Sequence, residues 1–163
     1  MKLIRLAVFS VLSLFVIASL IGILLPAHVL VSRAVDISAP KDSVVGYLKD
    51  IEQWKSWMDG MQQASVQIQS AKQANLAGTE VTITNISDST VISSWVSRNG
   101  GVQTSTVRMI NDTIHKQTIV QWQFEQQLKW YPWERLGSMM NDKILGTMME
   151  KNLNNLKSLV EKK

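Results

Sequence analysis

The side chains that could carry acid–base chemistry are few and scattered in this sequence. His28 and His115 are its two histidines, and Glu125 lies in a stretch that alternates like a strand. General acid–base catalysis needs a titratable group in a cavity, together with a partner that tunes its pKa. We recognise no nucleophile–base pair and no spacing typical of metal ligands, and the chain has no cysteine. The sequence therefore predicts no catalytic residue, no metal site and no cofactor, and it excludes a disulfide framework.

Two arginines have the chemistry needed to hold an anionic group of a ligand. Arg98 and Arg108 both fall in stretches that we expect to be strands. An inward-facing guanidinium can bind a carboxylate or a phosphate, whereas an outward-facing one is simply solvated. We keep Arg108 as a candidate for the wall of a cavity.

The other candidates are mainly aromatic or contain sulfur. Trp54 and Trp57 are three residues apart and so share one side of a helical turn. They can pin that turn onto a sheet, line the opening of a ligand cavity, or contact a membrane. Trp95 lies in an expected strand, and it forms core or cavity wall.

Near the end of the chain, three further groups of apolar side chains are candidates: an alternating stretch, a set of methionines and a set of aromatic residues. Val120, Trp122, Phe124 and Leu128 share one face of an alternating stretch, and they form core or cavity wall. Methionine is flexible and suits an adaptable apolar wall as well as a plain core. The methionines in question are Met139, Met140, Met148 and Met149, and the aromatic residues around Pro132 are Trp130, Tyr131 and Trp133.

These aromatic residues can form a rigid corner, line the mouth of a cavity or contact lipid. The predicted cavity residues are therefore Trp54, Trp57, Trp95, Arg108, Val120, Trp122, Phe124, Trp133, Met140 and Met148.

The elements that must position these residues follow from periodicity and turn signals. Alternating β-branched residues predict a strand over 28–40, and Pro40 opens a helix over 40–51 that continues as a turn or two to Gly60. Turn signals then separate further strands, which we place at 65–70, 79–86, 89–98, 102–110 and 114–128. A linker over 129–137 leads into a long C-terminal helix. In it Leu145, Met149, Leu153, Leu156 and Val160 form one apolar stripe.

The N-terminal segment differs from the rest of the chain. Residues 6–25 form an uncharged run of 20 residues, which is long enough to span the hydrocarbon core of a bilayer. Lys2 and Arg5 precede the run, so the positive-inside rule places the N-terminus in the cytoplasm and the following domain outside it. The alternatives are a signal peptide cleaved near Ser32 and Ala34, or a helix buried in a soluble protein.

The charge of the chain gives no support for nucleic-acid binding. The formal net charge is +4, but three of the 17 basic residues, Lys2, Arg5 and Arg33, flank the apolar segment. That leaves 14 basic residues against 13 acidic ones in the rest of the chain, which is therefore close to neutral. A nucleic-acid footprint would need a basic patch that this domain lacks. We divide the chain into a membrane anchor, 1–27, and a domain, 28–163.

The domain resembles the START-like superfamily, also called SRPBCC, and in particular its polyketide cyclase/dehydratase-like branch. The resemblance rests on "VDISAPKDSVVGYLKDIEQWKSWM" and on the tail "WQF…WYPWERLGSMMNDKILGTMMEKNLNNLKSLVE", and it covers roughly residues 28 to 162. It implies an α+β helix-grip fold, in which a curved antiparallel sheet wraps a long C-terminal helix. In this family an apolar cavity lies between the two.

From this resemblance we expect a single-pass, membrane-anchored domain that binds a hydrophobic small molecule or lipid in that cavity. Two alternatives remain open at the level of sequence. One is an enzyme of the cyclase/dehydratase type, which requires a polar group with a perturbed pKa in the cavity. The other is a non-binding envelope or assembly module, whose interior is filled. The sequence does not identify protein partners.

Overall fold

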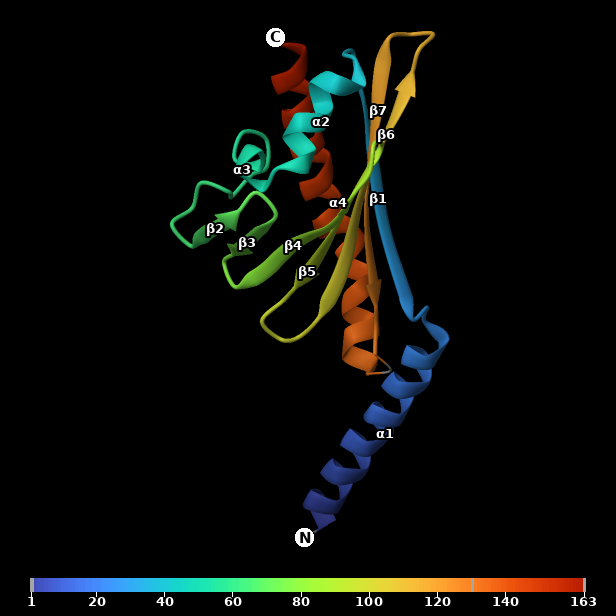
Figure 1. Ribbon diagram of the computed structural model, residues 1–163. Helices are drawn as coiled ribbons and strands as arrows, with labels where there is room; N and C mark the ends of the chain where they lie inside the picture. Colours follow the sequence, from blue (N-terminus) through green and yellow to red (C-terminus); the bar gives the residue numbers. More distant parts are fainter. Residues whose placement is uncertain (1, 130, 163) are drawn as a thin grey trace.

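The computed structural model describes residues 2–129 and 131–162, without the side chains of Pro132, Leu136, Met139, Met140 and Asn141. A seven-stranded antiparallel sheet curves beside a long C-terminal helix, and a separate helix projects from one end (Figure 1). This is the α+β architecture expected from the sequence, and the expectation is confirmed. Of the residues considered above, Trp130 and the side chains of Met139 and Met140 lie outside the described part.

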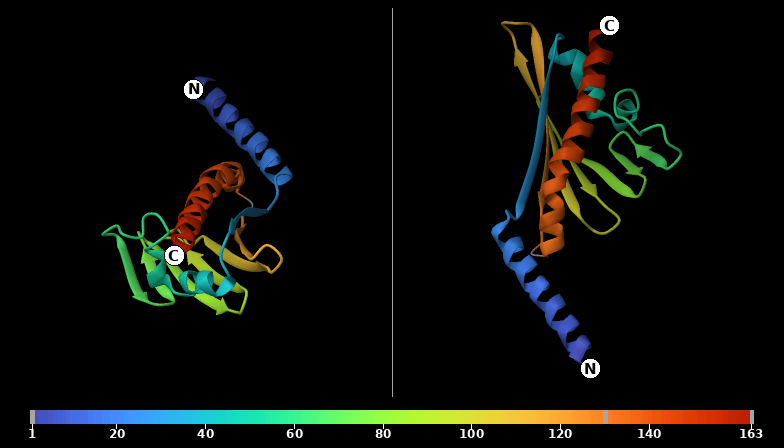
Figure 2. Two further views of the ribbon diagram at one scale, coloured as in Figure 1. Left: turned by 90° about the horizontal axis from the view of Figure 1, so that it is seen from above. Right: turned by 180° about the vertical axis from the view of Figure 1, so that it is seen from behind.

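The chain begins with α1 (Lys2–Leu24), which is followed by β1 (His28–Ile37). Within the described residues, α1 is the one helix with enough length and apolar character to cross a membrane. Most of its side chains are exposed, because α1 extends away from the domain (Figures 1 and 2). The helix is therefore not part of the core.

Two short helices connect the first strand to the rest of the sheet. Pro40 precedes α2 (Lys41–Lys49). After Asp50, α2 is followed by α3 (Ile51–Trp54). The carboxylate of Asp50 accepts a hydrogen bond of 2.8 Å from the backbone N–H of Glu52, which caps α3 at its start. Trp54 and Trp57 come at the end of this segment, before Gly60, whose φ of 84° ends the helical turns.

The remaining strands form a meander. They are β2 (Val66–Ser70), β3 (Gln73–Leu76), β4 (Thr79–Ile86), β5 (Thr90–Val96), β6 (Val102–Asp112) and β7 (Gln117–Gln127). The order across the sheet is β1-β7-β6-β5-β4-β3-β2, so β1 and β2 are its edges. In Figure 2 the sheet, seen from above, curves past the C-terminal helix.

Three details differ from the sequence prediction. The sequence analysis placed no strand over 73–76, where "QANL" has no β-branched residue, but pairing on both sides makes it β3. The last strand begins at Gln117 rather than at residue 114, since residues 113–116 form a turn in which Lys116 has a φ of 53°. The final helix, α4 (Pro132–Glu161), begins at Pro132, inside the predicted linker. Proline is favoured at the first position of a helix.

The core lies between the inner face of the sheet, α2, the α3 segment and one side of α4. The predicted stripe on α4 is largely confirmed, because Met149, Leu153, Leu156 and Val160 are at most 5% exposed. Leu145 is partly buried against the same cluster. Opposite this stripe, alternate residues of β7 point inward, and β1 runs alongside α4.

Candidate functional site

Five aromatic side chains form a closed ring in the interior. Trp54 and Trp57 come from the α3 segment, Trp95 from β5, and Trp122 and Phe124 from β7. The Trp54 and Trp95 rings stack at 6.2 Å, and Trp57 meets Trp122 edge-on at 5.8 Å. Trp122 lies 5.4 Å from Phe124, which lies 5.2 Å from Trp95, while Trp54 and Trp57 are 6.4 Å apart. Contacts of this geometry are favourable for aromatic pairs.

Each indole N–H of the ring already has a partner in the protein. Trp54 and Trp57 donate to the backbone carbonyls of Leu48 and Tyr47, at 3.2 and 3.0 Å. A buried polar group needs such a partner, because leaving it unpaired costs about 1–3 kcal/mol.

The two tryptophans on strands are satisfied by serine side chains on the same face of the sheet. Trp95 donates to the hydroxyl of Ser93 at 2.9 Å, and Trp122 donates to that of Ser105 at 2.8 Å. Both serines are at most 3% exposed. The ring therefore offers an essentially apolar surface to anything that lies against it.

A small cavity of about 10 Å³ lies beside this ring. Its walls come from the helical segments and from three central strands: Leu48, Trp54, Trp57, Met58, Val91, Ser93, Ser105, Val107 and Trp122. That volume is close to the minimum for a single water molecule and far below the roughly 300 Å³ of a small-molecule site. None of these described wall residues is titratable, and the only polar groups are the indole N–H groups and the two hydroxyls.

The structure brings together half of the predicted cavity residues. Trp54, Trp57, Val120, Trp122 and Phe124 are all at most 5% exposed and belong to one buried cluster. Trp95 is partly buried and packs against that cluster. Only Trp54, Trp57 and Trp122 border the cavity, whereas Val120 and Phe124 pack in the surrounding core.

Three other candidates do not lie in the interior. Arg108 is exposed, because its neighbours Val107 and Met109 are the inward-facing residues of β6, which turns Arg108 to the opposite face. The inward placement considered for this arginine is therefore wrong. Trp133 is 60% exposed and Met148 is 38% exposed. The side chain of Met140 lies outside the described residues.

The sequence analysis overlooked several wall residues. Leu48 is the buried side of α2, and Val91, Ser93, Ser105 and Val107 follow the alternation of β5 and β6. The serines were missed because hydroxyl residues in strands suggest an outer face. Extending the alternation from Trp95 back to Ser93 would have placed the first of them inside.

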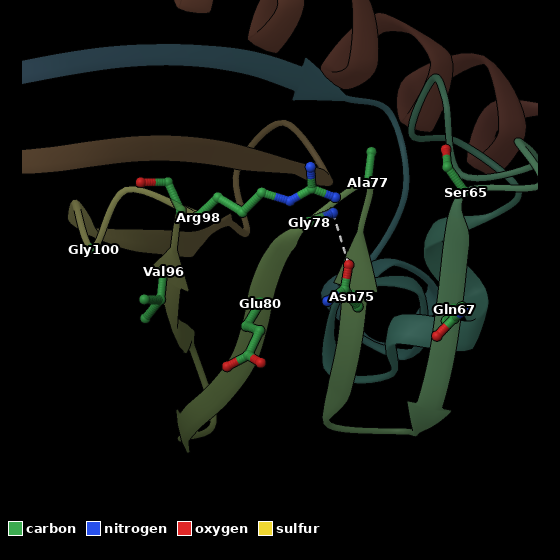
Figure 3. Close-up of a pocket in the computed structure, with 10 residues that line it drawn as sticks. Ser65, Gln67, Asn75, Ala77, Gly78, Glu80, Val96, Arg98 and Gly100 are labelled. Atoms are coloured by element: carbon green, nitrogen blue, oxygen red, sulfur yellow. Dashed lines mark hydrogen bonds between the residues drawn. The ribbon is translucent and has the colours of Figure 1, made fainter.

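A much larger hollow lies elsewhere, on the face of β2–β5 that points away from the core. It is an open groove of about 790 Å³, and its polar lining includes Gln67, Asn75, Glu80 and Arg98 (Figure 3). The side-chain Oδ1 of Asn75 accepts a hydrogen bond of 2.7 Å from the Gly78 N–H, and the Arg98 guanidinium lies against Gly78. Arg98 is exposed here, so the inward position considered for it is wrong. An open groove with a mixed polar and apolar lining does not enclose an apolar ligand.

The titratable groups with shifted pKa values lie at the surface. A hydrogen bond from Lys41 lowers the pKa of Asp88, and a hydrogen bond from the His115 ring lowers the pKa of Asp112. Hydrogen bonds to Asp142 and Glu150 raise the pKa of Arg33. In the described part of the chain, no three His, Asp or Glu side chains are placed to hold a metal ion. None of these groups borders the cavity.

The match to a family model decides which family this fold belongs to. Residues 28–161 match the model described as "Polyketide cyclase / dehydrase and lipid transport". The chain belongs to this family. A comparison with curated protein sequences gives no match.

Solved structures show the same fold at low sequence identity. A START superfamily protein from Mycobacterium smegmatis is 13% identical, with a TM-score of 0.63 over 82% of this chain and 97% of that one. A protein from Nitrosospira multiformis is also 13% identical, with a TM-score of 0.61 over 80% and 94%. The di-domain ARO/CYC protein BexL, from the BE-7585A biosynthetic pathway, is 12% identical, with a TM-score of 0.60 over 83% and 50%. Family and fold together indicate a hydrophobic-ligand-binding or cyclase-type domain.

Proposed function

We propose that this protein is a membrane-anchored domain that binds a hydrophobic small molecule or lipid in its interior, at the aromatic ring between the sheet and the α2–α3 segment, rather than directly against α4. The aromatic ring is the observation that carries the proposal. Its indole N–H groups are already paired inside the protein, so a ligand against it meets apolar surface and leaves no polar group unsatisfied. Burial of apolar area, at about 25 cal/mol per Å², would supply the affinity.

Binding requires the interior to expand. The 10 Å³ cavity holds no lipid chain, so a ligand must displace side chains or move the α2–α3 segment away from the sheet. Met58 and Met61 are buried in the segment that follows α3, and methionine adapts easily to a new shape. If the expanded state is rarely populated, the apparent affinity equals the affinity of that state multiplied by the fraction of molecules in it. We therefore expect binding to be weaker than the apolar area alone implies.

The wall chemistry favours passive binding over a cyclase or dehydratase reaction. Acid–base catalysis needs a titratable group within hydrogen-bond reach of the substrate. The described wall offers only the hydroxyls of Ser93 and Ser105, and both already accept hydrogen bonds from tryptophans. A ligand there can be held and oriented, and no described group is placed to exchange a proton with it.

The proposed anchor is α1, with the N-terminus in the cytoplasm and the domain outside it. Its length and apolar surface fit a membrane span, and Lys2 and Arg5 precede the apolar run. A signal peptide cleaved near Ser32 and Ala34 fits less well. Those residues pair with Gln123 and Gln121 in the middle of β1, so cleavage would remove most of an edge strand. Reporter fusions at the C-terminus test the orientation, and activity confined to the cytoplasm would overturn it.

One observation favours a second candidate function. The interior is nearly filled, which is what a non-binding envelope or assembly module would show. The two functions differ in whether the interior opens for an apolar molecule. The test must therefore change the cavity without changing the surface.

The experiment uses the full chain in lipid nanodiscs and the fluorescent apolar probe N-phenyl-1-naphthylamine. Val107→Ala enlarges the cavity and should strengthen probe binding, whereas Val107→Phe fills it and should abolish binding. Ile110→Phe is the matched control, because Ile110 is 52% exposed on the same strand. Overpacking costs about 1–3 kcal/mol, so melting curves must show that Val107→Phe is folded. Identical probe binding by all four proteins would exclude the interior site and favour the non-binding module.

A further inference from the structure

The last turns of α1 pack against α4 through small side chains. Ala18 and Ser19 are half-buried and Gly22 is buried, whereas most other side chains of α1 are exposed. Small residues on one side of a helix allow a second helix to approach closely, as in membrane helix pairs. The contact therefore joins the N-terminal helix to the domain through a defined face.

Arg135 of α4 completes this contact by capping the end of α1. Its guanidinium donates to the backbone carbonyls of Gly22, Ile23 and Leu25, at 3.0, 3.4 and 2.9 Å. It also donates to the carbonyl of Lys129, at 3.3 Å. The last carbonyls of a helix have no partner within it, and a positive charge is favourable at that end. Arg135 therefore fixes the direction in which α1 leaves the domain.

This contact fixes the position of the start of α4 along the axis of α1. Ala18 and Leu24 are six residues apart, which corresponds to about 9 Å along a helix. Because α4 contacts α1 within this stretch, its first turns lie at the level of the last turns of α1. If α1 spans a bilayer, the start of α4 must lie in the headgroup region at the end of the span.

The side chains at this end suit such a position. Trp133 is 60% exposed and stacks on Tyr131, with ring centroids 4.9 Å apart and planes 9° from parallel. Tryptophan and tyrosine are enriched where a membrane meets water, because they combine an apolar ring with a polar group. An exposed tryptophan stacked on a half-buried tyrosine beside a membrane span is placed for lipid contact.

Two strands start near this end of the domain and add exposed apolar side chains. Leu30 is 57% exposed near the start of β1, and Val102 is 53% exposed at the start of β6. His28 pairs with Gln127, and Gln103 pairs with Gln126, so both strands start beside the end of β7. Figure 1 shows the start of β1 and the end of β7 next to α1, with the turn between β6 and β7 at the opposite end.

We propose that Leu30, Val102, Tyr131 and Trp133 form a membrane-contact surface that rests on the lipid headgroup–acyl boundary, with Arg135 holding it beside α1. The proposal rests on the membrane anchoring proposed above. It adds that the domain does not move freely on its anchor. The domain contacts the bilayer with the start of α4 toward the lipid and the β6–β7 turn away from it.

The absence of cysteine in the natural chain allows a clean labelling test. Single cysteines replace Trp133, Phe15 in α1, or Ile114, which is 85% exposed in the β6–β7 turn. Each full-length variant carries a bimane label in vesicles of phosphatidylcholine and phosphatidylglycerol, with or without brominated acyl chains. We expect the bromines to quench the labels at positions 15 and 133 and to leave the label at position 114 bright.

Each outcome supports or overturns a specific step. Quenching at 15 without quenching at 133 would leave the anchor in place and overturn the membrane-contact surface. No quenching at 15 would overturn the anchoring and, with it, this inference. A label at 133 that is shielded only at high protein-to-lipid ratios would show that a second copy covers the surface instead.

Arg135→Gln tests the role of the cap. In the Trp133→Cys background it should reduce quenching at position 133, while quenching at 15 in the matching Phe15→Cys background stays the same. Quenching at 133 that does not change with Arg135→Gln would show that the aromatic pair finds the bilayer without the cap.

Discussion

Arg33 of β1 lies across α4 at Gly146 and binds acidic residues on both sides of that glycine. Its Nε is 2.6 Å from Glu150 Oε1, and its Nη1 is 3.2 Å from Asp142 Oδ1. A Cβ on Gly146 would lie 2.2 Å from the Nη2 atom of Arg33. The missing side chain of Gly146 therefore leaves the space in which Arg33 of the edge strand β1 packs against α4.

This relationship predicts that two glycines in one helix respond differently to alanine. Gly137→Ala should raise the free energy of unfolding by about 1 kcal/mol, because alanine is the better helix former and no described atom lies within 4 Å of its new Cβ. Gly146→Ala gains the same propensity, but it displaces the Arg33 guanidinium from Glu150 and Asp142. Thermal melts of the two variants should show a clearly smaller gain, or a loss, for Gly146→Ala.

A double variant tests the cause. In an Arg33→Met background there is no guanidinium to displace, so Gly146→Ala should recover a gain similar to that of Gly137→Ala. If the two glycine variants melt alike in the natural background, the contact with Arg33 has no energetic consequence.

The hydroxyl of Ser105 is predicted to matter through Trp122. Ser105→Ala leaves the Trp122 N–H unpaired in a site where both residues are at most 2% exposed. An unsatisfied buried donor costs about 1–3 kcal/mol. Ser94→Ala is the control, because Ser94 lies on the outer face of β5 and should change stability by less than about 0.5 kcal/mol. Equal melting temperatures for the two variants would show that the N–H finds another partner.

Much of the fold could be predicted because its elements carry strong local patterns. The alternation through Val120, Trp122 and Phe124 identified the inner face of β7, and the three- and four-residue spacing identified the buried side of α4. These patterns are local, so one sequence is enough to detect them. The strand at 73–76 has no such pattern and is defined by its neighbours.

The candidate site was predicted less well because it depends on contacts between distant elements. The stack of Trp54 on Trp95 and the contact of Trp57 with Trp122 form only when the sheet curves under the α3 segment. The size of the cavity depends on how these rings pack together, and the spacing of residues along the sequence does not reveal that packing. The outward position of Arg108, however, follows from its buried neighbours, and stricter use of alternation would have found it.

The turn between β6 and β7 is predicted to depend on pH through Asp112. Its carboxylate accepts hydrogen bonds from the His115 ring at 2.7 Å and from the N–H groups of Ile114 and His115 at 3.0 and 3.2 Å. These bonds lower the pKa of Asp112, with the His115 ring as the largest cause.

A lowered carboxyl pKa fixes the direction of the pH effect. The contribution of Asp112 to stability is fully present above the unfolded-state pKa of about 3.9, and it is lost as the pH falls through the lower folded-state pKa. The difference in melting temperature between the natural protein and Asp112→Asn should therefore shrink in acid. NMR titration should show the pKa of Asp112 rising toward its ordinary value in His115→Ala, and an unchanged pKa would contradict the role of the ring.

The connection between α4 and the segment after α3 is predicted to depend on Asn152. This side chain is fully buried, and its Oδ1 accepts a hydrogen bond of 2.9 Å from the Asp59 N–H. Asn155 donates to the Trp57 carbonyl and to the Asp59 carboxylate, each at 3.1 Å. Lys151 adds an ion pair of 2.6 Å to Asp59, so three residues of α4 hold the segment that contributes Trp57 to the aromatic ring.

Asn152→Ala should increase local opening of this segment while the rest of the domain stays folded. We expect faster hydrogen exchange at the Asp59 amide and a lower free energy of unfolding, because this partly buried N–H loses its acceptor. The loss is smaller than for a fully buried donor, since the substitution also removes the buried, unpaired Nδ2 of Asn152. Asn154→Ala is the matched control, because Asn154 is exposed on the same helix. If the interior opens for ligands beside Trp57, Asn152→Ala should also speed binding of the naphthylamine probe. Unchanged exchange at Asp59 would show that Asn155 and Lys151 hold the segment without Asn152.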